Sequence, residues 1–68
     1  MTAPHKNRWH FWIDRGGTFT DIVARRPDDT IETAKVLSLH PDYPDAAIEG
    51  IRRLMGVTRA APLPVDDI

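Results

Sequence analysis

The stretch FWIDRGGTFTDIVARR, residues 11–26, contains two apolar runs separated by two adjacent glycines and a threonine. The first run ends in Asp14, and the second run continues through residues 19–25. Aromatic and β-branched residues favour strands, and glycines between two such runs favour a turn. We therefore predict a β-hairpin whose turn contains Gly16 and Gly17.

The flanking residues extend this hairpin into a three-stranded sheet. The first two strands are expected at residues 9–14 and 19–25. A second turn is expected at PDDT, residues 27–30, because proline and aspartate are typical turn residues. Residues 31–37 then alternate between polar and apolar side chains, as a half-buried strand does. The sequence therefore predicts an antiparallel meander.

A helix is predicted from Tyr43 to Met55, where the hydrophobic pattern changes its period. Glu49, Arg52 and Arg53 are expected to point away from the apolar face of this helix. That face is formed by residues three and four positions apart, namely Ala47, Ile48, Ile51, Leu54 and Met55.

Residues at both ends of the predicted helix suit its termini. We expect Asp42 to be the N-cap, Pro44 to lie in the first turn, and Asp45 to interact favourably with the helix dipole. Gly56 suits the position after the last turn, where a left-handed backbone is common.

Composition excludes several classes of protein. The chain has 68 residues and a net charge of −1, which argues against the basic surface of a nucleic-acid-binding protein. It has no cysteine, so disulfide frameworks and thiolate metal sites are excluded. No signal-peptide pattern and no apolar run of about 18 residues occurs. We expect a soluble, cytoplasmic protein that binds neither nucleic acid nor a membrane.

The chain divides into three parts by composition. Residues 1–7 are polar and are expected to form a disordered leader. Residues 8–57 contain all the predicted strands and the helix. Residues 58–68 contain two prolines and are expected to be a truncated linker into a missing remainder.

The glycine turn has the residues that a phosphate-binding loop needs. Glycines let backbone N–H groups approach an anion, because they accept positive φ and carry no Cβ. Gly16 and Gly17 meet this need, Thr18 and Thr20 add hydroxyl donors, and Asp14 can orient Mg²⁺ through water. The GxxxxGK[ST] and GxGxxG spacings are absent. From spacing alone an ordinary turn is the more frequent explanation, so both interpretations stay open at this point.

Three segments resemble the opening of the hydantoinase A/5-oxoprolinase family without gaps: IDRGGTFTDIVARRPD, KVLS at 35–38, and DAAIEGIRRLMG at 45–56. The resemblance runs from Trp9 to Gly56 and is closest to 5-oxoprolinase members. It implies an α/β fold, or α+β for this segment alone, that begins an actin-like ATPase domain. Arg15 favours the 5-oxoprolinase branch, since hydantoinase-type relatives often carry an apolar residue there.

The resemblance also implies a reaction and its cofactors, ATP and Mg²⁺. The parent enzyme is expected to hydrolyse the lactam 5-oxo-L-proline to L-glutamate, with ATP cleavage driving the opening of the ring. Asp14 is expected to help place the magnesium–nucleotide complex. The residues expected to contact phosphate are Gly16, Gly17, Thr18 and Thr20.

Asp21 and Asp29 lie outside the expected phosphate contacts. Asp21 matches the last aspartate of the family motif and receives no role. Asp29 stands in the second turn where relatives commonly have glycine, so that turn is expected to be strained or of a different type.

Alternatives remain for the activity. One is an ATP-dependent hydantoinase or a carboxylase subunit of the same family. Another is a non-catalytic, truncated remnant. No catalytic nucleophile or base is assigned within these residues, and the segment alone is expected to be inactive. Its expected partners are 5-oxoproline and the remainder of the parent polypeptide, and a homo-oligomer stays open.

Overall fold

A computed structural model of the chain describes residues 8–68 and shows an α+β arrangement. Its elements are the strands β1 (His10–Arg15), β2 (Phe19–Arg25) and β3 (Ile31–Leu37), the helix α1 (Ala46–Met55), and a 3₁₀ turn, η2 (Val65–Asp67). The strands form one antiparallel sheet in the order β1-β2-β3. The predicted meander followed by one helix is confirmed. The predicted leader, residues 1–7, lies outside the described residues.

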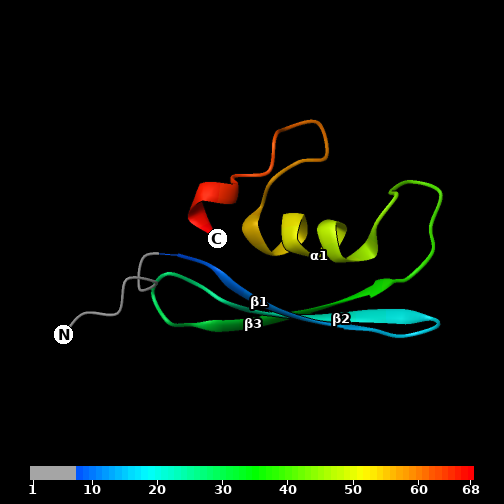
Figure 1. Ribbon diagram of the computed structural model, residues 1–68, viewed down its shortest axis with the longest axis horizontal. Coiled ribbons are helices and arrows are strands. Elements are labelled where there is room, and N and C mark those ends of the chain that lie inside the picture. The colour runs from blue at the N-terminus through cyan, green and yellow to red at the C-terminus, as the bar shows by residue number, and fades with distance from the viewer. Residues whose placement is uncertain (1–7) are drawn as a thin grey trace.

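Helix α1 and the segment that follows it lie over one face of the sheet (Figure 1). The core between the two layers is built around Ile22 and Ala24 of β2, which are fully buried. Gly50 of α1 lies so close to Ile22 that a Cβ added there would be 2.3 Å from the Ile22 Cδ1 atom. The helix therefore packs directly on the middle strand. The remaining members of the core cluster are Val36, Tyr43, Ala46 and Leu54.

The helix begins three residues later than predicted, and its N-cap is Asp45 instead of Asp42. Asp45 has an extended backbone, and its Oδ1 accepts a hydrogen bond of 3.1 Å from the Ile48 N–H. The reason lies at Pro44, because a residue that precedes proline is disfavoured in the α region. Tyr43 is instead buried in the core cluster, and its hydroxyl donates to the Leu37 carbonyl at 2.7 Å.

The other end of α1 is as predicted. Gly56 adopts a left-handed backbone with φ of 72°, and its N–H bonds to carbonyls of the last helical turn. A residue with a Cβ would be strained there, which explains the glycine.

The buried face of α1 differs from the predicted one, most clearly at Ile48 and Glu49. Ile48 is 41% exposed, whereas Glu49 is only 5% exposed. Glu49 is buried because two arginines neutralise its carboxylate: Arg53 donates to it at 2.8 Å, and Arg59 donates two hydrogen bonds at 2.8 and 2.9 Å. These bonds, first those from Arg59, lower the pKa of Glu49 to about 2.

The segment after α1 folds back along the helix. Arg52 donates to the Thr58 carbonyl at 2.8 Å and to the Ala61 carbonyl at 2.6 Å. Farther on, the Trp9 N–H bonds to the Asp67 carbonyl at 2.6 Å, which ties η2 to the start of β1. Residues 58–68 thus contact the helix and Trp9, the residue before β1. The predicted role of this segment as a linker stays a prediction.

The aromatic cluster of residues 9–12, at and just before the start of β1, is divided between the two faces of the sheet. Trp9 and Phe11 pack against the core, and their rings are stacked at 5.7 Å. Trp12 points to the opposite face and is 52% exposed. This division follows the alternation of side chains along a strand.

The second turn confirms the expectation for Asp29. This residue has a φ of 69°, the left-handed conformation that glycine adopts more easily. Asp28 stabilises the turn by accepting hydrogen bonds from the hydroxyl and the N–H of Thr30 at 2.6 and 3.1 Å. The hydroxyl bond is the main cause of a lowered pKa for Asp28.

Candidate functional site

The candidate site is the turn between β1 and β2, which we call the glycine loop and define as Gly16, Gly17 and Thr18. It lies at one end of the sheet, and all three residues are exposed. Asp14 belongs to the strand that enters the loop, and Thr20 to the strand that leaves it. The structure therefore brings the predicted site residues to one end of the sheet, but on different faces of it.

Gly16 is required by the fold itself. Its N–H donates to the Phe19 carbonyl at 2.9 Å and closes the hairpin. A Cβ at this position would be 2.5 Å from the Phe19 carbonyl oxygen, which is too close for any side chain. The loop glycines do not use the positive φ that glycine accepts: of the glycines in residues 8–68, only Gly56 has positive φ.

Gly17 has no comparable structural reason to be glycine. A Cβ added to it would have no atom of the chain within 4 Å. In the part of the chain that the structure describes, the N–H groups of Gly17 and Thr18 have no hydrogen-bond acceptor. Two adjacent backbone donors are thus exposed beside a position that lacks a side chain, which is an arrangement that fits an approaching anion.

Ser38, directly after β3, holds the glycine loop in place through hydrogen bonds to two of its carbonyls. Its hydroxyl donates to the Gly16 carbonyl at 2.7 Å, and its N–H donates to the Thr18 carbonyl at 2.8 Å. The Thr20 hydroxyl lies 2.9 Å from the Ser38 hydroxyl. Since the proton of Ser38 is used on a carbonyl, Thr20 must be the donor in that pair. Two carbonyls of the loop are therefore held by one residue.

Sequence reasoning did not single out Ser38. The available signal was the register of the meander: Phe19 lies opposite Leu37, so the next residue along β3 lies beside Thr18. A serine at that place can reach the loop with both its backbone and its side chain.

Thr20 is placed differently from the other predicted residues. It is 1% exposed and faces the helix side of the sheet, whereas Thr18 is exposed. Its hydroxyl is engaged by Ser38. The predicted contact of Thr20 with phosphate stays a prediction.

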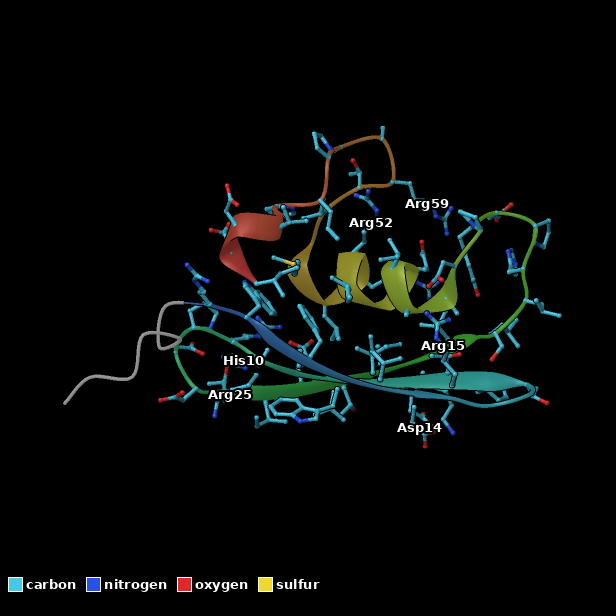
Figure 2. All side chains as sticks on the ribbon, viewed as in Figure 1. His10, Asp14, Arg15, Arg25, Arg52 and Arg59 are labelled. Atoms are coloured by element: carbon cyan, nitrogen blue, oxygen red, sulfur yellow. The ribbon has the colours of Figure 1, made fainter. Side chains whose placement is uncertain are left out.

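Asp14 points away from α1, on the opposite side of the sheet from Arg15 (Figure 2). It lies directly across from Asp21, and the Asp21 carboxylate is 3.8 Å from the Lys35 amine. The lysine thus partly neutralises one of two facing carboxylates. Among residues 8–68, no group of three or more potential metal-ligating side chains occurs. Asp14 could therefore supply one carboxylate to a hydrated magnesium ion, which is the arrangement magnesium commonly accepts.

Arg15 connects the base of the loop to the helix. Its guanidinium lies 3.2 and 3.3 Å from the two carboxylate oxygens of Asp45, the N-cap of α1. The Ile48 N–H, and then Arg15, lower the pKa of Asp45. Loop and helix start are thus linked by an exposed ion pair.

Comparison with known proteins identifies close sequence relatives. The family model described as the hydantoinase/oxoprolinase N-terminal region matches residues 10–68. 5-Oxoprolinase 1 of Arabidopsis thaliana is 39% identical over 93% of the chain, and the 5-oxoprolinase of Saccharomyces cerevisiae is 47% identical over 76%. The 5-oxoprolinase of Dictyostelium discoideum is 53% identical over 66%.

The matched regions are a small part of these relatives. The chain spans 6% of the Arabidopsis protein and 4% of the yeast and Dictyostelium proteins. No solved structure matches the chain significantly. No helix within residues 8–68 is long and apolar enough to cross a membrane.

Proposed function

Since the chain belongs to the hydantoinase/oxoprolinase family and matches its N-terminal region, we propose that it forms the phosphate-binding wall of the ATP site in a 5-oxoprolinase. The parent enzyme would convert 5-oxo-L-proline to L-glutamate. Relatives that are 39% and 53% identical and named 5-oxoprolinase support this choice of substrate.

The proposal rests on the surroundings of Gly17. The fold leaves space beside this residue and no acceptor for its N–H or for that of Thr18. A phosphate oxygen would fill that space and accept both hydrogen bonds. Fixed backbone donors of this kind stabilise charge without reorganising when the reaction occurs. The exposed Thr18 hydroxyl is a third donor at the same place.

Asp14 would take part through magnesium. Its carboxylate is exposed at the strand end that leads into the loop, where a water ligand of the ion could donate a hydrogen bond to it. When bound, magnesium and ATP would supply charge neutralisation and the phosphoryl group that makes lactam opening favourable. The residues of this chain would bind and orient these groups, and the remaining catalytic residues would come from elsewhere in the parent polypeptide.

The same proposal places the chain at the start of an actin-like ATPase domain. In that arrangement the first hairpin of the domain contacts the nucleotide phosphates. The hairpin, the third strand and the packed helix described above are compatible with this placement.

The test is ADP release by the native polypeptide, meaning the longest natural polypeptide that contains this segment. We expect release that depends on 5-oxo-L-proline and yields one glutamate for each ADP. Release only with a hydantoin, or only with a ketone and bicarbonate, would keep the ATP site and replace the substrate. No release with any of them would favour the non-catalytic alternative.

A further inference from the structure

The orientation of the Gly16–Gly17 peptide group depends on Ser38. In a planar trans peptide the C=O and the following N–H point in opposite directions. The Ser38 hydroxyl holds the Gly16 carbonyl at 2.7 Å, so the Gly17 N–H of the same peptide group points away from Ser38. The hydrogen bond from Ser38 to the Gly16 carbonyl thus fixes the direction of the Gly17 N–H, the donor that would meet phosphate.

Few other contacts restrain this peptide group. Neither Gly16 nor Gly17 has a side chain, and glycine backbones have the most conformational freedom to lose. Within residues 8–68, the Gly16 carbonyl has no hydrogen-bond donor besides Ser38. The hydroxyl therefore supplies a restraint that these loop residues cannot supply themselves.

Ser38 is itself held in place. Its N–H is bonded to the Thr18 carbonyl at 2.8 Å, and its hydroxyl oxygen accepts from the buried Thr20 hydroxyl at 2.9 Å. The three groups form a chain of hydrogen bonds in one direction, from Thr20 through Ser38 to Gly16. Each bond in such a chain polarises the next and strengthens it.

We propose that Ser38 is a positioning residue of the ATP site, which orients the Gly17 N–H toward phosphate without touching the nucleotide. This inference rests on the proposed function of the glycine loop. Loss of the hydroxyl frees the Gly16–Gly17 peptide group to rotate, so bound nucleotide loses one well-placed donor.

The experiment compares Ser38→Ala with Ser38→Thr in the native polypeptide. A non-hydrolysable ATP analogue with Mg²⁺ is the probe, and its affinity is measured by calorimetry. Hydrogen exchange of the peptides that cover the glycine loop and α1 is measured with and without saturating analogue. We expect Ser38→Ala to weaken binding about tenfold, the effect of one lost hydrogen bond to a charged group, and to reduce the protection of the loop that saturating analogue gives. Ser38→Thr keeps the hydroxyl and should bind like the wild type.

Two results separate positioning from a purely structural role. Positioning predicts that α1 exchanges at the wild-type rate in Ser38→Ala, whereas a general loss of stability would accelerate exchange in α1 as well. If Ser38→Ala does not fold, Ser38→Cys carries the test, because a thiol has a similar shape and is a weak donor. Its affinity should also fall.

The proposal is overturned if the wild type binds the analogue and the folded alanine or cysteine variant binds it equally well. It is also overturned if Ser38→Thr loses affinity as Ser38→Ala does while α1 exchange rises in both. A wild type that binds no nucleotide would instead reject the proposed function, and this inference with it.

Discussion

Gly16 and Gly17 are adjacent in the sequence, yet only Gly16 is required by packing within the chain. A Cβ at Gly16 would collide with the Phe19 carbonyl at 2.5 Å, whereas a Cβ at Gly17 would meet no atom within 4 Å. This difference separates a glycine that closes the hairpin from a glycine that is available for a ligand.

Alanine substitutions test this difference. Gly16→Ala should destabilise the chain by about 1–3 kcal/mol, because the hairpin must distort to accommodate the Cβ. Gly17→Ala should change the free energy of unfolding by less than about 0.5 kcal/mol. Urea denaturation followed by tryptophan fluorescence measures both. Equal losses would mean that Gly17 also has a structural role.

Asp14 is predicted to act on magnesium and not on stability. Asp14→Asn should raise the magnesium concentration needed for ADP release at least about tenfold, as the loss of an outer-shell partner does. It should not reduce stability, because it removes one of two like charges that face each other across the strands. Asp21→Asn, on the same sheet face, is the matched control. Equal losses of activity and stability in Asp14→Asn would show that the residue is structural.

The residue types of the sequence predicted the glycine loop, but they did not predict all of its contacts. The glycines, threonines and aspartate of the first turn could be recognised from the sequence, because each has its own conformational or donor property. The role of Ser38 could not, since it depends on the register between β2 and β3. The burial of Thr20 also depends on which sheet face receives the helix.

Among the elements, the three strands were predicted correctly, whereas the predicted start of the helix was wrong. Alternating side chains and polar turns are local signals, and the observed strands lie within one residue of the expected bounds. The start of α1 depends on Pro44 and on the buried Tyr43, which is a tertiary effect. The burial of Glu49 depends on its hydrogen bonds with Arg59, ten residues farther along the chain. The periodicity of residues within a helix cannot predict such a contact.

The observed N-cap gives a direct prediction. Asp45→Ala should cost about 1 kcal/mol, because it removes the acceptor for the Ile48 N–H. Asp42→Ala, at the position first expected to be the cap, should cost less than about 0.5 kcal/mol. Urea denaturation of both variants checks this, and a larger loss in Asp42→Ala would contradict the observed helix start.

The contacts of Glu49 predict a dependence on pH. Its pKa is lowered from 4.5 to about 2, so its stabilising contribution is present above pH 4.5 and is lost as the pH falls toward 2. Glu49→Gln should cost about 1–2 kcal/mol at neutral pH, less than for a fully buried pair because both arginines are half-exposed.

The difference between Glu49→Gln and the wild type should shrink below pH 4.5 and disappear near pH 2. The matched control is Glu32→Gln, which removes an exposed partner of Arg26 and should cost less than about 0.5 kcal/mol. A difference for Glu49→Gln that does not change with pH would argue that the ion pairs are not its cause.

At the scale of the whole molecule, the two faces of the sheet are unequal. One face is covered by α1 and the segment after it (Figure 1). In residues 8–68 the other face carries exposed apolar side chains, including Trp12, Phe19 and Leu37. Alternation predicted two faces but not which one the helix covers, because that choice depends on packing between Gly50 and Ile22.

The glycine loop stands at the end of this two-layer unit, with Ser38 behind Gly16 and with Arg15 joined to the helix start. The sheet and the helix thus hold a loop whose open side has two backbone donors and no side chain at Gly17. We propose that nucleotide phosphate binds on that open side.

The most direct test is binding of Mg·ATP to the native polypeptide and to its Gly17→Val variant, measured by calorimetry. Thr33→Val, on the exposed part of β3, is the control for a new β-branched side chain elsewhere on the sheet. We predict that Gly17→Val loses at least about a hundredfold in affinity by blocking the approach of phosphate and leaving two donors unused, while Thr33→Val binds like the wild type. Binding by Gly17→Val that equals the wild type would contradict this binding site, because the glycine loop would then not contact the nucleotide.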